Sequence, residues 1–133
     1  MSEAAVREAV DRLVAAFGEG RLDDYFASFH PDCSFVFHTT PERLPSVEAY
    51  RRLWRRWVED DGFEVLSCTT SGTEIRSWGD VAVVTHDVAT RIRTRGGEED
   101  LAERETIVMA RQPDGRWLGI HEHLSPSAKG DRA

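Results

Sequence analysis

The chain has 133 residues, and 17 Lys and Arg against 24 Asp and Glu give it a net charge of −7. This length is typical of one domain, and 40% hydrophobic residues are the composition of a folded globular protein. An acidic chain lacks the basic footprint of nucleic-acid binders, and no apolar run approaches the roughly 18 residues of a membrane span. We therefore expect one cytoplasmic domain over residues 1–133, with a disordered tail at 127–133 and neither nucleic acid nor membrane as a partner.

The N-terminal segment predicts two helices. The first ends at Gly18, and its apolar residues recur at helical spacing; they are Val6, Val10, Leu13, Val14 and Phe17. A short second helix spans residues 22–29 and stops at Pro31. Each helix has an apolar face, as helices that pack on a core do.

A strand and a third helix follow. Residues 33–39 are rich in β-forming side chains and predict the strand, and residues 46–58 predict the helix. Tyr50, Trp54 and Trp57 lie on the apolar face of this helix. They are expected either to pack in the core or to cover the mouth of a pocket for an apolar ligand.

From residue 63 onward the pattern changes from helix to strand. The β-rich segments are residues 64–78, 81–94, 101–111 and 116–125. Between them stand Gly-Asp at 79–80, Gly-Gly at 96–97 and Pro-Asp-Gly at 113–115, which favour tight turns. The predicted order is ααβαββββ, an α+β fold in which helices are segregated from a long, curved antiparallel sheet.

Two local motifs carry a resemblance to a known superfamily. The run AAFGEGRLD at 15–23 resembles the junction between its first two helices. Trp117 followed by His121, His123 and Ser125 is similar to the last hairpin of SnoaL-like proteins and of the association domain of calmodulin-dependent kinase II. With the element order, these motifs make residues 4–126 resemble the nuclear transport factor 2-like superfamily. The resemblance implies three helices closing one end of a cone-shaped sheet, no cofactor, and a homodimer formed through the outer sheet face.

The side chains that act in known members of this superfamily are replaced here. Ketosteroid isomerases place a catalytic Tyr and a basic Asp where this chain has Leu13 and Phe37. The association domain places arginines where this chain has Val88, Ile107 and Leu124. The resemblance therefore implies an apolar pocket in place of a carboxylate-binding one, and it argues against isomerisation of steroids.

Strand alternation offers two sets of side chains for the wall of the pocket, because residues i and i+2 share a face. If the apolar positions named above face the pocket, so do His86, Glu105 and Glu122. The opposite set is Trp117, His121, His123 and Ser125 with Arg104 and Thr106. A single bulge would exchange the two sets, so both remain open.

We take candidate site residues from both sets. The candidate catalytic residues are His86, Glu122 and His123, since burial adjusts a carboxyl group for acid–base chemistry near neutral pH. The candidate ligand-binding residues are His38, Tyr50, Trp54, Trp57, Val88, Arg104, Ile107 and His121. Alternatively, the two C-terminal histidines have a structural role on the outer face or at a subunit contact. No metal site is expected, because histidines at i and i+2 supply fewer ligands than zinc requires.

Two hypotheses of function follow. In the first, a SnoaL-like protein binds a small, largely apolar organic molecule in its cone pocket and, if it is an enzyme, catalyses isomerisation, cyclisation or dehydration without a cofactor. In the second, the chain is a non-catalytic ligand-binding or oligomerisation module, which the replacement of the known catalytic residues favours.

Overall fold

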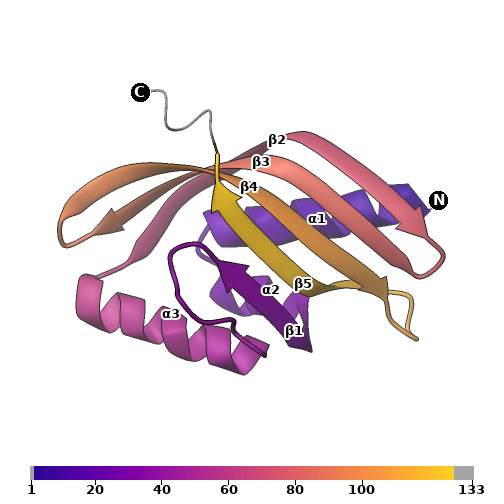
Figure 1. Ribbon diagram of the computed structural model, residues 1–133, viewed down its shortest axis with the longest axis horizontal. Helices are drawn as coiled ribbons and strands as arrows, with labels where there is room; N and C mark the ends of the chain where they lie inside the picture. The colour runs from indigo at the N-terminus through magenta and orange to yellow at the C-terminus, as the bar shows by residue number, and fades with distance from the viewer. Residues whose placement is uncertain (1, 128–133) are drawn as a thin grey trace.

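The computed structural model describes residues 2–127 of the chain (Figure 1). Its elements are α1 (Ser2–Gly18), α2 (Leu22–Ala27), β1 (Phe29–Phe37), α3 (Val47–Asp61), β2 (Glu64–Trp78), β3 (Val81–Thr94), β4 (Gly97–Arg111) and β5 (Trp117–Pro126). The order ααβαββββ and the α+β class are confirmed. Of the tail predicted at 127–133, only Ser127 is described; it is buried, and its N–H donates a hydrogen bond to the carbonyl of Ala102. The rest of that segment lies outside the described residues.

The strands form one curved sheet in the order β1-β5-β4-β3-β2 (Figure 1). Neighbouring strands from β2 to β5 are antiparallel and are joined by the predicted turns. β1 runs parallel to β5, with Phe35 opposite Glu122. The sheet is therefore mixed where a wholly antiparallel one was predicted. No hairpin joins β1 to β5, and it is the short hairpin connection that requires antiparallel pairing.

The helices pack against different strands. α1 packs mainly on β2, and α3 packs on β1 (Figure 1). α3 begins after Ser46, whose side chain caps its first turn, and ends at Gly62, whose φ of 65° lies in the left-handed region. Arg95, at the tip of the β3–β4 hairpin, donates hydrogen bonds from its guanidinium to the carbonyl oxygens of Glu59 and Asp60. The hairpin tip is thereby tied to the C-terminal end of α3.

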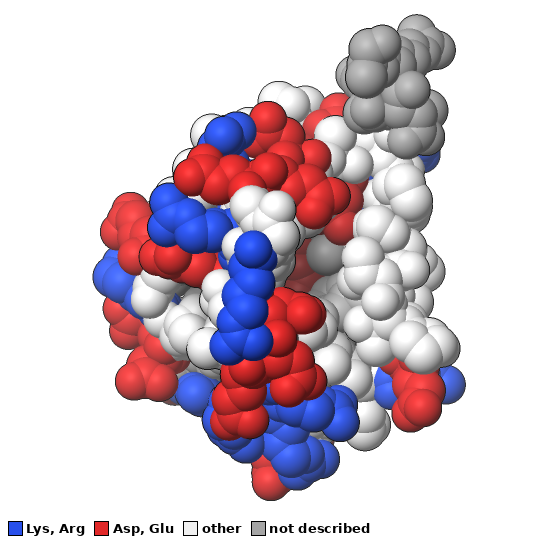
Figure 2. Space-filling view, turned by 90° about the vertical axis from the view of Figure 1, so that its left-hand side faces the viewer, with Lys and Arg blue, Asp and Glu red and all other residues white. Residues whose placement is uncertain are grey.

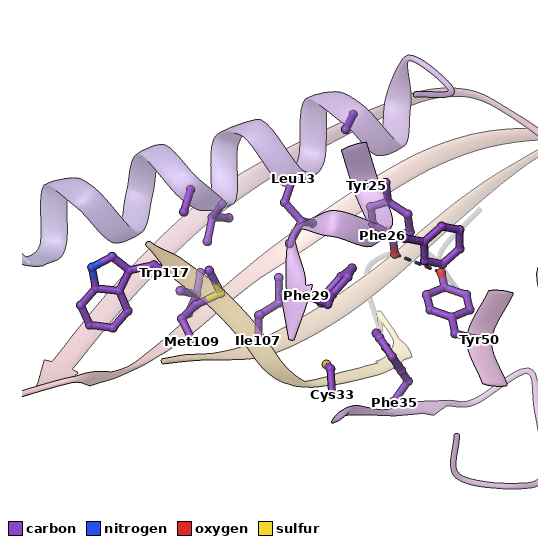
Figure 3. Packing of buried hydrophobic residues seen from close by; sticks show 14 of the residues in the cluster. Leu13, Tyr25, Phe26, Phe29, Cys33, Phe35, Tyr50, Ile107, Met109 and Trp117 are labelled. Carbon is purple, nitrogen blue, oxygen red and sulfur yellow. Dashed lines mark hydrogen bonds between the residues drawn. The ribbon is translucent and has the colours of Figure 1, made fainter. Parts of the chain in front are cut away.

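The core between the helices and the inner face of the sheet is rich in aromatic rings (Figure 3). The ring centroid of Tyr25 lies 5.3 Å from that of Phe29 and 6.0 Å from that of Tyr50. Ile107 and Met109 of β4 are fully buried in the same cluster. Because side chains alternate along a strand, their burial fixes which residues of β4 face inward.

β5 contains one extra residue, Ile120, that changes the face on which its side chains lie. Adjacent residues of β4 pair with Gly119 and His121, so Ile120 has no residue opposite it. Trp117 faces the core before this bulge, and Glu122 faces it afterwards. The inner face of the sheet thus contains Trp117 from one of the two alternative sets of side chains and Glu122 from the other.

Candidate functional site

Two adjoining cavities lie between the helices and the inner face of the sheet. The inner cavity, whose wall includes Tyr25 and Glu122, has a volume of about 50 Å³. The outer one, which we call the mouth cleft and which is lined by Trp54, Trp57 and Glu99 among others, has a volume of about 300 Å³. The two share the lining residues Phe17, Tyr50, Thr90, Glu103 and Leu124. The mouth cleft has room for a small organic molecule, whereas the inner cavity admits only small polar groups or water.

Three ionisable side chains lie together beside the inner cavity. His86 on β3 pairs with Glu105 on β4, and its Nε2 lies 2.6 Å from Oε1 of Glu105. Glu122 on β5 also interacts with Glu105. The His86 side chain is 0% exposed and Glu122 is 2% exposed. Within residues 2–127, no hydrogen-bond donor reaches Oε1 of Glu122, and Nδ1 of His86 has no partner.

The pKa values of the two buried carboxyl groups are shifted in opposite directions. Burial raises the pKa of Glu122 well above its usual value, and the charge of Glu105 raises it further. Burial acts in the same direction on Glu105, but hydrogen bonds from Glu122 and His86 outweigh it and lower the pKa of Glu105. Two carboxylates offer only acceptors, so the contact becomes a hydrogen bond when Glu122 is protonated and donates to Glu105. The pair places an acid beside a base.

A pair of tyrosines adds hydrogen-bond donors to the same cavity. The hydroxyl oxygens of Tyr25 on α2 and Tyr50 on α3 lie 3.0 Å apart (Figure 3). Burial raises the pKa of both phenols, and the nearby Glu122 raises it further. Both side chains therefore keep their protons at neutral pH. One hydroxyl hydrogen is used between them, and the other can donate to a group in the cavity.

The mouth cleft combines aromatic rings with carboxylates. Its rings belong to Phe17, Phe37, Tyr50, Trp54, Trp57 and Phe63. Its carboxylates belong to Asp61, Glu99 and Glu103, and Oε2 of Glu103 lies 2.6 Å from Nε2 of His38. Figure 2 shows the molecule from the left-hand side of Figure 1, and in this view acidic side chains gather beside a hollow. An apolar molecule with a polar group would match this lining.

Several predicted site residues meet at these cavities. Tyr50, Trp54, Trp57, Val88 and Glu122 are among their lining residues. The aromatic residues of α3 thus line the cavities, and two of them, Tyr50 and Trp54, are also part of the buried core.

Three other predicted residues on this side do not reach the cavities directly. His86 lies behind Glu105 and lines neither the inner cavity nor the mouth cleft. Ile107 is 0% exposed within the core. His38 contacts the mouth cleft only through Glu103.

Arg104, His121 and His123 lie on the outer face of the sheet. Arg104 and His123 border a separate hollow of about 290 Å³ there, and Nδ1 of His121 lies 2.8 Å from Oγ of Ser34. Of the two alternatives left open by the sequence, Glu122 faces the cavities and His123 faces the outer side, because neighbouring side chains on a strand alternate between its faces. The same separation removes Arg104 and His121 from the candidate ligand pocket.

Sequence reasoning selected neither Glu103 nor Tyr25. Glu99, Glu103 and Glu105 lie on one face of β4 with Ile107, so strand alternation could have found them together. Glu105 was weighed but not selected. Tyr25 belongs to a short helix in which every aromatic residue suits the core equally well, and nothing in the sequence distinguishes it.

Other kinds of site receive no support from residues 2–127. No group of three or more His, Cys, Asp or Glu there could hold a metal ion. No helix in the same range is long and apolar enough to cross a membrane. Cys33 and Cys68 are free cysteines.

These features define a class of protein: an α+β domain whose cone of strands and helices surrounds a pocket with acid–base groups at its inner end. A family model described as SnoaL-like domain matches residues 6–129, and the chain belongs to this family. No curated protein matches the sequence.

Solved structures share the fold at low sequence identity. A nuclear transport factor 2-like superfamily protein from Salmonella enterica serovar Typhimurium is 18% identical, with a TM-score of 0.79 over 96% of this chain and 94% of that one. A protein from Catenulispora acidiphila in complex with S-DNPA is 17% identical, with a TM-score of 0.78 over 98% and 97%. A putative calcium/calmodulin-dependent protein kinase II association domain from Xanthomonas campestris is 21% identical, with a TM-score of 0.75 over 93% and 86%. These likenesses confirm the predicted fold.

Proposed function

We propose that the chain binds a small, largely apolar organic molecule in the mouth cleft and exchanges a proton with it through Glu122. The observation that supports this is the carboxyl group of Glu122, buried at the inner end of an aromatic-lined pocket and paired with Glu105. Burial raises the pKa of Glu122 well above its usual value, and a carboxyl group with a raised pKa holds a proton that it can exchange with a ligand. Isomerisation, cyclisation and dehydration are reactions that such proton transfer can catalyse without a cofactor.

The neighbours of Glu122 have separate roles in this proposal. Glu105 carries the negative charge of the pair and accepts the hydrogen bond of the protonated Glu122. His86 is a positioning residue, because its Nε2–H donates to Glu105 and it does not line the cavity. A hydroxyl of the Tyr25–Tyr50 pair donates to an oxygen of the ligand on which negative charge develops.

The mouth cleft supplies the binding part of the proposal. The rings of Trp54 and Trp57 lie with their centroids 5.9 Å apart and offer an aromatic wall for the apolar part of a ligand. One protein of the same fold, that from Catenulispora acidiphila, has a small molecule bound, which supports ligand binding by this architecture.

The substrate 5-nitrobenzisoxazole tests proton transfer without knowledge of the natural ligand. A base in an apolar pocket removes its C3 proton, the ring N–O bond breaks, and a coloured phenolate forms. We expect the wild type to accelerate this reaction increasingly as pH rises and Glu122 loses its proton, and Glu122→Gln to abolish the acceleration. Glu74→Gln, which changes an exposed carboxylate of β2, is the matched control. Equal rates for wild type and Glu122→Gln would refute the role of Glu122.

The same experiment separates the two hypotheses of function. A protein that binds the neutral compound 1-naphthalenemethanol in the mouth cleft, but gives no rate that depends on Glu122, is the non-catalytic ligand-binding module. The homodimer and the cytoplasmic location remain predictions from the sequence, and light scattering at micromolar concentration tests the first of them.

A further inference from the structure

Acidic side chains gather along the walls of the two cavities. Their carboxyl groups belong to Asp61, Glu99, Glu103, Glu105 and Glu122. Within the described part of the chain, no Lys, Arg or His lines either cavity. An anionic ligand would have to leave water for a pocket of its own sign, which is electrostatically costly. The lining therefore disfavours a negatively charged ligand, in addition to limiting the ligand's shape.

Strand alternation separates the charges of the β3–β4 hairpin between the two faces of the sheet. Glu98 is hydrogen-bonded to Arg91 and Arg93, all of them exposed. Glu99, the next residue, pairs with the buried Ile92 and lines the mouth cleft. The arginines of the hairpin thus pair with acidic side chains outside the pocket, and among residues 2–127 no basic side chain stands on the pocket wall beside those inside it.

Two carboxyl groups reach the cavities from nearly buried positions. His38 occupies one oxygen of Glu103, whose side chain is only 12% exposed and lines both cavities. Deeper in the pocket, Oε1 of the nearly fully buried Glu122 receives no hydrogen bond from residues 2–127. A donor on the ligand would satisfy an oxygen that the described protein groups leave unpaired.

We infer that the ligand of this site is an organic cation, with an ammonium group beside Glu103 and its apolar part against Trp54 and Trp57. Aromatic faces combined with carboxylates are the usual surroundings of a bound organic ammonium, since the rings attract the cation and still accept its hydrocarbon part. The inference deepens the proposed function and rests on it, because it takes the mouth cleft as the binding site. It narrows the substrate class to amines and excludes carboxylic acids and phosphate esters.

Three probes with one ring system and different charges test the inference. They are 1-naphthylmethylammonium, 1-naphthalenemethanol and 1-naphthoate, compared by isothermal titration calorimetry at neutral pH and low salt. We expect the ammonium to bind about tenfold or more tightly than the alcohol, and the carboxylate to bind more weakly than either. Binding of the alcohol or the carboxylate at least as tightly as the ammonium overturns the inference and leaves the proposed pocket intact. Failure of all three to bind overturns the pocket as well.

Substitutions locate the charge effect. Glu103→Gln and Glu99→Gln should each weaken ammonium binding several-fold and change alcohol binding by less than about twofold. Glu98→Gln, which removes the same charge from the other face of the same hairpin, should alter neither. If Glu103→Gln does not fold, Glu99→Gln and Asp61→Asn provide the test, because both of those side chains are exposed at the mouth. Equal weakening of all probes by these variants, or an effect of Glu98→Gln as large as theirs, would also overturn the inference.

Discussion

Replacing Glu122 with Gln removes a buried carboxyl group whose pKa lies well above its ordinary value of 4.5 in the folded protein. In the unfolded chain that group ionises near its ordinary pKa. Between the two pKa values the folded state therefore holds one proton more than the unfolded state, and the stability that this proton contributes is lost as pH rises. The expected loss from this group alone is about 1.4 kcal/mol per pH unit.

Gln has nearly the shape of the protonated Glu and can donate the same hydrogen bond to Glu105, but it does not titrate. The free energy of unfolding of Glu122→Gln minus that of the wild type should therefore increase by about 1.4 kcal/mol per pH unit, from about pH 5 upwards until the raised pKa is passed. Urea unfolding at a series of pH values, followed by tryptophan fluorescence, measures this difference.

The matched control is Glu74→Gln, which removes a carboxylate that is exposed in the folded protein. Glu74→Gln should follow the wild type in parallel over the same pH range, because Glu74 is exposed. Parallel curves for wild type and Glu122→Gln would mean that Glu122 is ionised in the folded protein, and both the shared proton and its proposed role in catalysis would have to be abandoned.

Two further predictions concern β5 and the inner cavity. Deleting Ile120 removes the bulge and joins Gly119 directly to His121, and these two residues already pair with the adjacent β4 residues Met109 and Val108. Glu122 should therefore stay opposite Ile107 and face inward, so we expect a variant that still unfolds cooperatively; Ile120→Ala, which keeps the bulge, should cost no more than about 1.5 kcal/mol. Loss of cooperative unfolding in the deletion variant would contradict this. Burial raises the pKa of Cys68 from 9.0 to about 11, so its reaction with a thiol reagent near pH 7 should be about 100-fold slower than that of an exposed cysteine and should accelerate with pH. Reaction at the ordinary rate would show that the thiol is not buried as described.

The local features of the fold could be predicted because local interactions determine them. The residue types at 79–80, 96–97 and 113–115 favour hairpins whatever the rest of the chain does, and all three hairpins occur, the second with its turn at 95–96, one residue before the predicted position. The predicted helix at 46–58 extends to Asp61, because its end is set by the left-handed Gly62 rather than by its last apolar residue. Such boundary errors leave the architecture unchanged.

The site could be predicted only in part, because it depends on events outside any local pattern. The bulge at Ile120 follows Gly119, and a glycine inside a strand is compatible with a bulge but does not require one. The bulge nevertheless decides that Glu122 faces inward, as Trp117 does, and that His123 faces outward. The pairing of Tyr25 with Tyr50 joins two helices whose relative placement only the folded core determines. Residue types alone placed Glu122 among the candidates but selected neither Glu103 nor Glu105, and they left open which face of β4 and β5 lines the cavities.

The position of β5 in the sheet has a consequence for how the domain is made. The last strand described is an interior one, with β4 on one side and β1 on the other. Ser34 and His121 are hydrogen-bonded although they stand 87 positions apart in the chain. Until residues 117–126 leave the ribosome, β1 has no neighbour in the sheet and Glu105 has no second carboxyl group beside it. High contact order of this kind slows folding, so we expect the acid–base pair to assemble late and together with the domain as a whole.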